Sequence, residues 1–109
     1  MPVQHKHLAA GRWFELTLAE QLGNIGSEVH RAAASRGKSE DDFRVAFQRA
    51  LELIDLTLAD PRWRGRLKEI ARLRELLGDA ASGGVTYLTT LEDLDRYLMH
   101  FAIAARLRR

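Results

Sequence analysis

The sequence predicts an all-α fold, an up-down-up-down four-helix bundle, and three observations support this prediction. Apolar side chains recur at spacings of three and four residues in four separate stretches, as one buried helix face requires. Residues that cap or interrupt helices bound each stretch. The connections are short, so consecutive helices should run antiparallel. We therefore expect a flexible leader over residues 1–12 and a single domain over residues 13–109.

The first helix should begin near Thr17, because Thr17 and Glu20 have the spacing of a capping box. In a capping box, the hydroxyl and the carboxylate each bind a backbone N–H that the first turn would leave unpaired. Gly37 should end this helix. The predicted apolar seam consists of Leu18, Leu22, Ile25, Val29 and Ala32.

The second helix should begin after Ser39, a predicted N-cap followed by three acidic residues that favour the positive end of the helix dipole. It should close at Asp60, because proline disfavours helical backbone at the residue before it. Its apolar positions are Phe43, Phe47, Leu51, Ile54 and Leu58.

The third helix should begin at Pro61, which suits a first helical position, or near Arg66 if Gly65 delays the regular helix. Gly78 and the small residues over 80–84 should end it. Its apolar stripe is Trp63, Leu67, Ile70, Leu73 and Leu77.

Residues 85–88 should form a short extended link to the fourth helix, where Thr90 and Asp93 repeat the capping pattern. This helix should end in a basic segment, which suits the negative end of the dipole. Its apolar stripe is Leu91, Leu94, Leu98, Phe101 and Ala105.

Composition excludes several classes of function. The chain has no cysteine, which rules out disulfides, thiolate metal sites and cysteine nucleophiles. No glutamate stands three residues before a histidine, so the di-iron site of ferritin-like bundles is excluded. The N-terminus lacks the apolar core of a secretory signal, and no apolar run approaches the roughly 20 residues of a membrane span. We expect a cytoplasmic protein with no catalytic residue, metal, cofactor or membrane contact.

Two glycines lie inside the predicted first helix, where each costs about 1 kcal/mol relative to alanine. We expect a neighbouring helix to approach closely at these glycines, and Asn24 to set the register between helices. The polar flank that contains Asn24 is a solvated surface, a subunit interface or a binding face. The predicted interface residues are Gly23, Asn24, Gly26, Ser27, Glu28 and Arg31.

Charge is distributed unevenly along the chain. Residues 13–60 hold nine acidic against five basic residues, whereas residues 61–77 hold six basic against two acidic ones. We expect Asp55 to pair with Arg72 or Arg74 on the third helix.

The basic segment is the best candidate for phosphate contacts, with a tryptophan that could stack on a base. Alternatively, Trp63 anchors the core beneath solvated arginines, or the arginines pair with acidic helices across a subunit interface. The predicted nucleic-acid-binding residues are Arg62, Trp63, Arg64, Arg66, Lys68, Arg72, Arg106, Arg108 and Arg109.

The chain length, the four-helix plan and the segment Asn24-Ile25-Gly26-Ser27-Glu28 resemble the small bundle proteins of the 23S rRNA intervening-sequence class. Those proteins carry an Asn-Ile-Ala-Glu-Gly-type motif, and the present motif lies in the first helix rather than the second. The same superfamily includes the accessory variability determinants of diversity-generating retroelements. The resemblance implies a homo-oligomer, typically a pentamer with a basic surface, that binds a reverse transcriptase and RNA or DNA.

Our leading hypothesis is therefore a non-enzymatic, oligomeric accessory protein that binds nucleic acid and a reverse transcriptase. The first alternative is a protein–protein interaction bundle, either toxin–antitoxin-like or associated with ribosomal RNA. A helical ribonuclease built on Arg96 and His100 is a further alternative. It is disfavoured because the two residues are too close in sequence and no polar residue follows the arginine.

Overall fold

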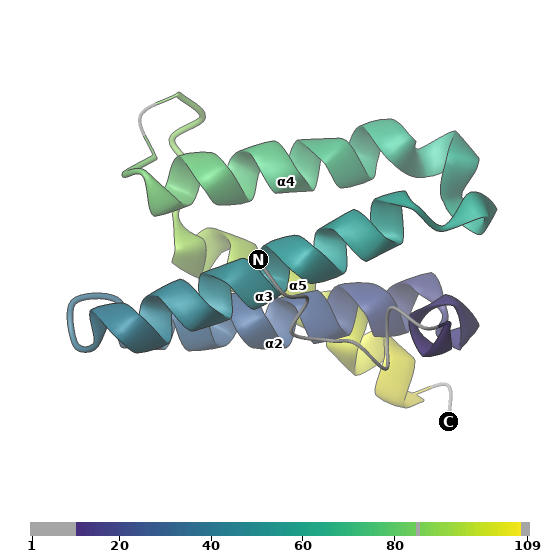
Figure 1. The fold of residues 1–109 in the computed structure, drawn as a ribbon, viewed down its shortest axis with the longest axis horizontal. Helices are drawn as coiled ribbons and strands as arrows, with labels where there is room; N and C mark the ends of the chain where they lie inside the picture. The colour runs from purple at the N-terminus through teal and green to yellow at the C-terminus, as the bar shows by residue number, and fades with distance from the viewer. Residues whose placement is uncertain (1–10, 85, 108–109) are drawn as a thin grey trace.

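The computed structural model describes residues 11–84 and 86–107, and four α-helices make up most of this part of the chain (Figure 1). No strand occurs among the described residues, so the all-α prediction is confirmed. The regular up-down-up-down order stays a prediction. The elements are η1 (Arg12–Glu15), α2 (Leu18–Ser35), α3 (Glu40–Leu58), η2 (Pro61–Arg66), α4 (Leu67–Ala81) and α5 (Leu91–Leu107), where η marks a 3-10 helix.

The capping patterns predicted the helix starts correctly. The Glu20 backbone N–H donates to the Thr17 hydroxyl at 3.1 Å, and the Glu20 carboxylate accepts from the Thr17 N–H at 2.9 Å. Thr90 and Asp93 form the same pair of bonds before α5. The Ser39 hydroxyl accepts from the third residue of the α3 first turn at 3.2 Å. Local side-chain bonds therefore define where three of the four helices begin.

Helix α4 ends within the predicted run of small residues over 80–84, but Gly78 does not end it. The helix continues through Gly78 to Ala81, because the chain reverses only at Gly83 and Gly84, whose φ angles are 110° and 71°. The predicted extended link is also wrong where it is described, since the Asp79 carboxylate accepts the backbone N–H groups of Thr86 and Tyr87 at 3.0 Å and holds a turn there. Position 85 lies outside the described residues.

Helix α2 occupies the centre of the fold and packs against both α3 and α5. In Figure 1, α3 and α4 lie along the long axis, and α5 passes behind α3 and α2 and emerges beyond α2. The predicted seam of α2 is buried from Leu22 to Ala32. Residues 1–10 of the predicted leader lie outside the described part, but Arg12, the last residue of the predicted 1–12 leader, belongs to η1, and the next residue, Trp13, is fully buried.

The two glycines of α2 face α5. A Cβ atom built on Gly26 would lie 2.8 Å from Cβ of Leu98, and one built on Gly23 would lie 3.0 Å from Cα of Ala102. Real Cβ atoms do not reach the first distance. The close approach of α5 to α2 therefore depends on glycine at position 26 and is tight at position 23.

Candidate nucleic-acid interface

A buried polar cluster joins the end of α3 to η1, α2 and η2, and it orients the start of the basic segment. We call this cluster the Gln21 junction. Its members are Trp13, Gln21, Thr57, Asp60, Arg62 and Trp63.

The Gln21 side chain is fully buried and is bonded at both ends. Its amide nitrogen donates to the Trp13 carbonyl at 2.9 Å and to the Asp60 carboxylate at 3.1 Å. Its oxygen accepts from the Trp63 indole N–H at 2.8 Å. The Trp13 indole N–H donates to the Thr57 hydroxyl at 3.1 Å. Because buried polar groups are costly when unpaired, these bonds hold η1 and η2 against α2 and α3.

Asp60 carries the one negative charge of the junction. Its carboxylate accepts from Nη2 of Arg62 at 2.7 Å and from the Arg62 backbone N–H at 3.0 Å. The same guanidinium donates to the Leu16 carbonyl at 2.6 Å. The side-chain hydrogen bond from Arg62, with smaller contributions from its backbone N–H and from Gln21, lowers the pKa of Asp60 from 3.8 to about 2. Asp60 is therefore ionised at neutral pH, and it also caps η2.

Two of the predicted nucleic-acid-binding residues thus belong to the junction. The Arg62 guanidinium is paired with Asp60 and lies 4.5 Å from the centroid of the Trp63 ring. The Trp63 ring packs against the core and its N–H is bonded to Gln21. These contacts match the core-anchor alternative for Trp63, and they engage Nε and Nη2 of Arg62, which leaves fewer donors for a phosphate.

The other predicted cations of η2 and α4 are exposed. Arg66 pairs with Glu69 at 3.2 Å. Among the described residues, Arg64, Lys68 and Arg72 have no carboxylate partner. We call these three residues the cationic face. Lys68 and Arg72 are four residues apart on α4, so they lie on one side of the helix.

Arg72 and Arg74 take different partners. The Arg72 guanidinium lies 4.4 Å from the centroid of the Tyr87 ring, in the loop after α4. Arg74 pairs with Asp55 at 2.8 Å, which is one of the two pairings that we expected for that carboxylate. The Asp55 pair joins α3 to α4 and removes Arg74 from the cations available to a ligand.

The predicted C-terminal cations do not join the cationic face. Arg106 lies on α5 and lines hollows next to Gly23 of α2. Arg108 and Arg109 lie outside the described residues. The seven described residues of the predicted set are therefore divided into a bonded group of Arg62, Trp63 and Arg66, the cationic face, and a separate cation on α5.

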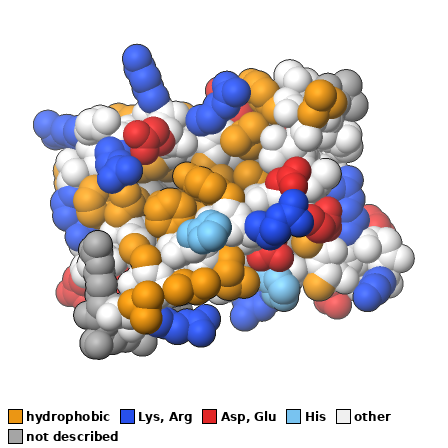
Figure 2. All heavy atoms as spheres, turned by 180° about the vertical axis from the view of Figure 1, so that it is seen from behind, with side chains coloured by type: hydrophobic (Ala, Val, Ile, Leu, Met, Phe, Trp, Pro, Cys, Tyr) orange, Lys and Arg blue, Asp and Glu red, His pale blue; other side chains and the backbone are white. Residues whose placement is uncertain are grey.

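Apolar side chains remain exposed along α5. Met99, Ile103 and Leu107 are 42%, 46% and 81% exposed, and their spacing of four places them along one side of the helix. We call them the α5 stripe. Figure 2 shows the side of the molecule opposite to Figure 1, where hydrophobic side chains gather among charged ones.

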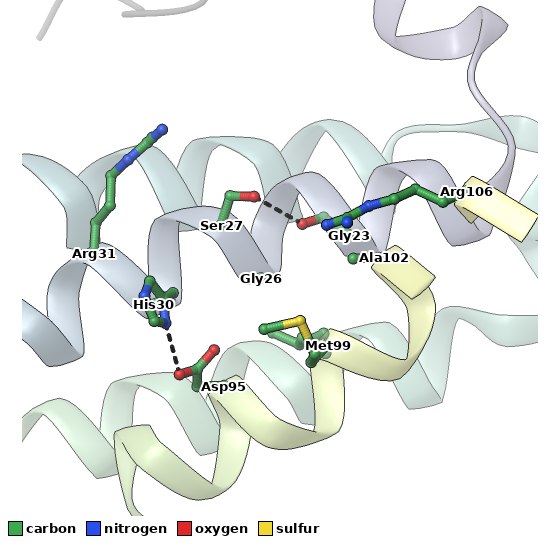
Figure 3. Close-up of a pocket in the computed structure, with 10 residues that line it drawn as sticks. Gly23, Gly26, Ser27, His30, Arg31, Asp95, Met99, Ala102 and Arg106 are labelled. Carbon is green, nitrogen blue, oxygen red and sulfur yellow. Dashed lines mark hydrogen bonds and ion pairs between the residues drawn. The ribbon is translucent and has the colours of Figure 1, made fainter. Parts of the chain in front are cut away.

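A hollow of about 230 Å³ lies along the contact of α2 with α5 and is lined by residues of both helices, including the two glycines (Figure 3). His30 of α2 and Asp95 of α5 meet across it, with 2.9 Å between Nδ1 and Oδ2. Arg31 and Arg106 both line the hollow, and Arg106 extends toward Gly23 in Figure 3. The His30–Asp95 pair therefore bridges the two helices at one end of the hollow.

The predicted interface residues have different environments. The Asn24 amide donates to the Glu20 carbonyl at 2.8 Å, and the Ser27 hydroxyl donates to the Gly23 carbonyl at 3.3 Å. Glu28 is buried and accepts from Arg31 at 2.8 Å. These side chains bond within α2, and the two glycines pack against α5.

The described residues offer no constellation typical of catalysis or metal binding. Arg96 is paired with Asp93, and His100 is exposed and has no hydrogen bond or ion pair there. No group of three or more metal-ligating side chains occurs in residues 11–84 and 86–107. No helix in the same part of the chain combines the length and hydropathy of a membrane span.

The sequence did not predict that Gln21, Thr57, Asp60 and the partners of Asp60 form one buried cluster. The only local signal was the Asp60–Pro61 boundary, because the other members come together from distant parts of the chain.

Comparison with family models, curated proteins and solved structures found no match to this chain.

Proposed function

We propose that this protein is a non-enzymatic accessory protein that binds nucleic acid through the cationic face on η2 and α4. The observation that carries the proposal is that Arg64, Lys68 and Arg72 are exposed and have no carboxylate partner among the described residues, with Lys68 and Arg72 on one side of α4. Phosphate oxygens are the natural partners of such cations, and their binding releases counterions from the nucleic acid.

The Gln21 junction supports the proposal by fixing the direction of η2. Arg62 pairs with Asp60, and Trp63 is bonded to Gln21 and packs against the core. The two residues that precede Arg64 are therefore held in place by an ion pair, a hydrogen bond and apolar packing. A cationic surface that is already ordered loses less conformational entropy when it binds a phosphate backbone. We therefore assign Arg62 and Trp63 a positioning role and the three exposed cations the contacts.

The partner and the assembly belong to the proposal through the resemblance to intervening-sequence proteins. We propose a cytoplasmic homo-oligomer, a pentamer if that resemblance holds, that assists a reverse transcriptase while it copies RNA or DNA. Its subunits would be regular up-down-up-down bundles. A protein–protein interaction bundle is the second candidate, and the exposed α5 stripe favours it because apolar side chains at helical spacing suit a partner surface.

The test is a fluorescence-anisotropy titration of labelled RNA and DNA oligonucleotides at increasing salt. The variant Arg64→Ala/Lys68→Ala/Arg72→Ala removes the cationic face. We expect it to weaken binding at least tenfold at low salt and to reduce the slope of log K against log salt by about 2 to 3, since each lost phosphate contact changes the slope by about 1.

The matched control is Arg12→Ala/Lys38→Ala/Arg44→Ala, which removes the same charge from exposed positions outside η2 and α4. It should bind almost as the wild type does. Equal weakening in both variants would show that net charge alone attracts the nucleic acid. An absence of any binding at low salt would contradict the proposed function.

A further inference from the structure

A mainly apolar groove of about 400 Å³ lies between α4 and α5, next to the cationic face. Its apolar lining comes from Leu73, Leu76 and Leu94, and Tyr97 of α5 forms an aromatic wall. Tyr97 is 55% exposed. The size is within the range of clefts that hold small ligands, about 300–1,000 Å³.

Arg72 belongs both to this groove and to the cationic face. Its guanidinium lies against Tyr87, so a cation and an exposed aromatic ring stand together at the rim. Tyr97 faces the groove from the opposite helix. A ligand held here would meet an apolar floor, an aromatic wall and a cation within one site.

We propose that this groove takes an unpaired base of single-stranded nucleic acid, whose backbone follows the cationic face. The inference rests on the proposed function and names its substrate class. Single-strand-binding surfaces combine a positive track for phosphates with aromatic side chains on which bases stack. A duplex keeps its bases stacked inside, so it would reach the cationic face but not the groove.

The two carboxylates that line the groove do not oppose this ligand. Glu69 is paired with Arg66, and Asp93 is paired with Arg96 and accepts the Thr90 backbone N–H. Hydrogen bonds from that N–H and from the Thr90 hydroxyl are the main causes that lower the pKa of Asp93, so it stays ionised and bonded. A carboxylate in this setting can accept from the exocyclic amino group of a base.

The experiment compares Tyr97→Ala with wild type on two probes, an unstructured oligonucleotide of uridines and a DNA duplex of equal length. We expect Tyr97→Ala to weaken single-strand binding by about tenfold, since stacking on an aromatic ring is worth roughly 1–3 kcal/mol per base. Duplex binding should change by less than about twofold. Tyr97→Phe keeps the ring and should restore single-strand binding.

A matched control is His100→Ala, which removes a ring from an exposed α5 position that belongs neither to the lining of this groove nor to the α5 stripe. Circular dichroism of each variant checks that the helices remain. If Tyr97→Ala binds the single strand as well as wild type, or if wild type prefers duplex, the groove does not take a base, although the proposed function stands. If neither probe binds, the inference and the proposed function both fail.

Discussion

Gln21 and Asp60 show how single polar residues organise this small fold. Both are buried, and they are bonded to each other although they lie 39 residues apart in the chain. Each bond contributes modestly by itself, but an unpaired member of such a buried cluster would cost about 1–3 kcal/mol. The cluster therefore favours one position of η2 over alternatives that apolar packing would tolerate.

We expect Asp60→Asn to destabilise the protein by on the order of 1–2 kcal/mol at pH 7. This is less than the full pKa shift would give, because Arg62 is partly exposed and solvent weakens its interaction with Asp60. The folded pKa lies below the ordinary value, so the folded state binds fewer protons. The stabilisation by Asp60 is complete above about pH 5 and is lost as the pH falls through 3.8 toward 2.

Urea unfolding of wild type and Asp60→Asn at several pH values between 7 and 2.5 measures this difference. The two curves of stability against pH should converge as the pH falls. Asp41→Asn is the control, because that side chain is 90% exposed in its ion pair and should cost less than about 0.5 kcal/mol. A difference between wild type and Asp60→Asn that stays constant with pH would contradict the assigned charge.

At the scale of elements, the crossing of α2 and α5 explains why a helix tolerates two glycines. Gly26 leaves room for Leu98, which is fully buried against α2. Glycine lowers the intrinsic stability of α2 at this position, and the close packing against α5 offsets that cost. Gly78 in α4 differs, because a Cβ atom at that position would meet nothing within 4 Å.

Substitution by alanine should change the stability of the protein in opposite directions at Gly26 and Gly78. We expect Gly26→Ala to destabilise the protein by about 1–3 kcal/mol, because the new methyl group would overlap Leu98. Gly78→Ala should stabilise it by about 0.5–1 kcal/mol, since it gains helix propensity without a clash. Thermal unfolding measures both. Equal stabilisation in the two variants would mean that α5 does not approach α2 at Gly26.

At the scale of the whole molecule, charge and apolar surface lie on different elements. The unpaired cations of η2 and α4 form the cationic face, whereas the α5 stripe carries exposed apolar side chains. A protein that binds nucleic acid on one element can therefore bind a second copy or a protein partner through another. This separation agrees with the oligomeric accessory role that we propose.

We expect light scattering coupled to size exclusion to give a mass that is a multiple of 12.4 kDa, and Ile103→Glu to reduce it by charging the α5 stripe. Leu88→Glu is a matched control, since Leu88 is 82% exposed in the loop before α5. A wild type that stays at the mass of one chain would contradict self-association. A reduced mass in both variants would contradict the assignment of self-association to the α5 stripe.

The sequence predicted the features that depend on residues close together in the chain, and it did not predict those that depend on distant ones. Capping pairs such as Thr17 and Glu20 are three residues apart, so the helix starts could be inferred correctly. The small residues over 80–84 mark the end of α4, but Gly78 does not, because glycine is compatible with a helix. The predicted extended link was wrong because the turn there depends on Asp79 binding N–H groups further along the chain. Of the candidate site, the exposed cations were inferable from charge, but the pairing of Arg62 was not.

The sequence by itself determined four helices, their buried faces and a basic segment, because periodicity, capping and charge are local properties of the chain. Only the tertiary structure decided which cations remain available, which helix fills the space above Gly26, and that a groove adjoins Arg72. The physical reason is that ion pairs, close packing and hollows form between residues distant in sequence. Their partners depend on how the helices cross, which local patterns do not encode.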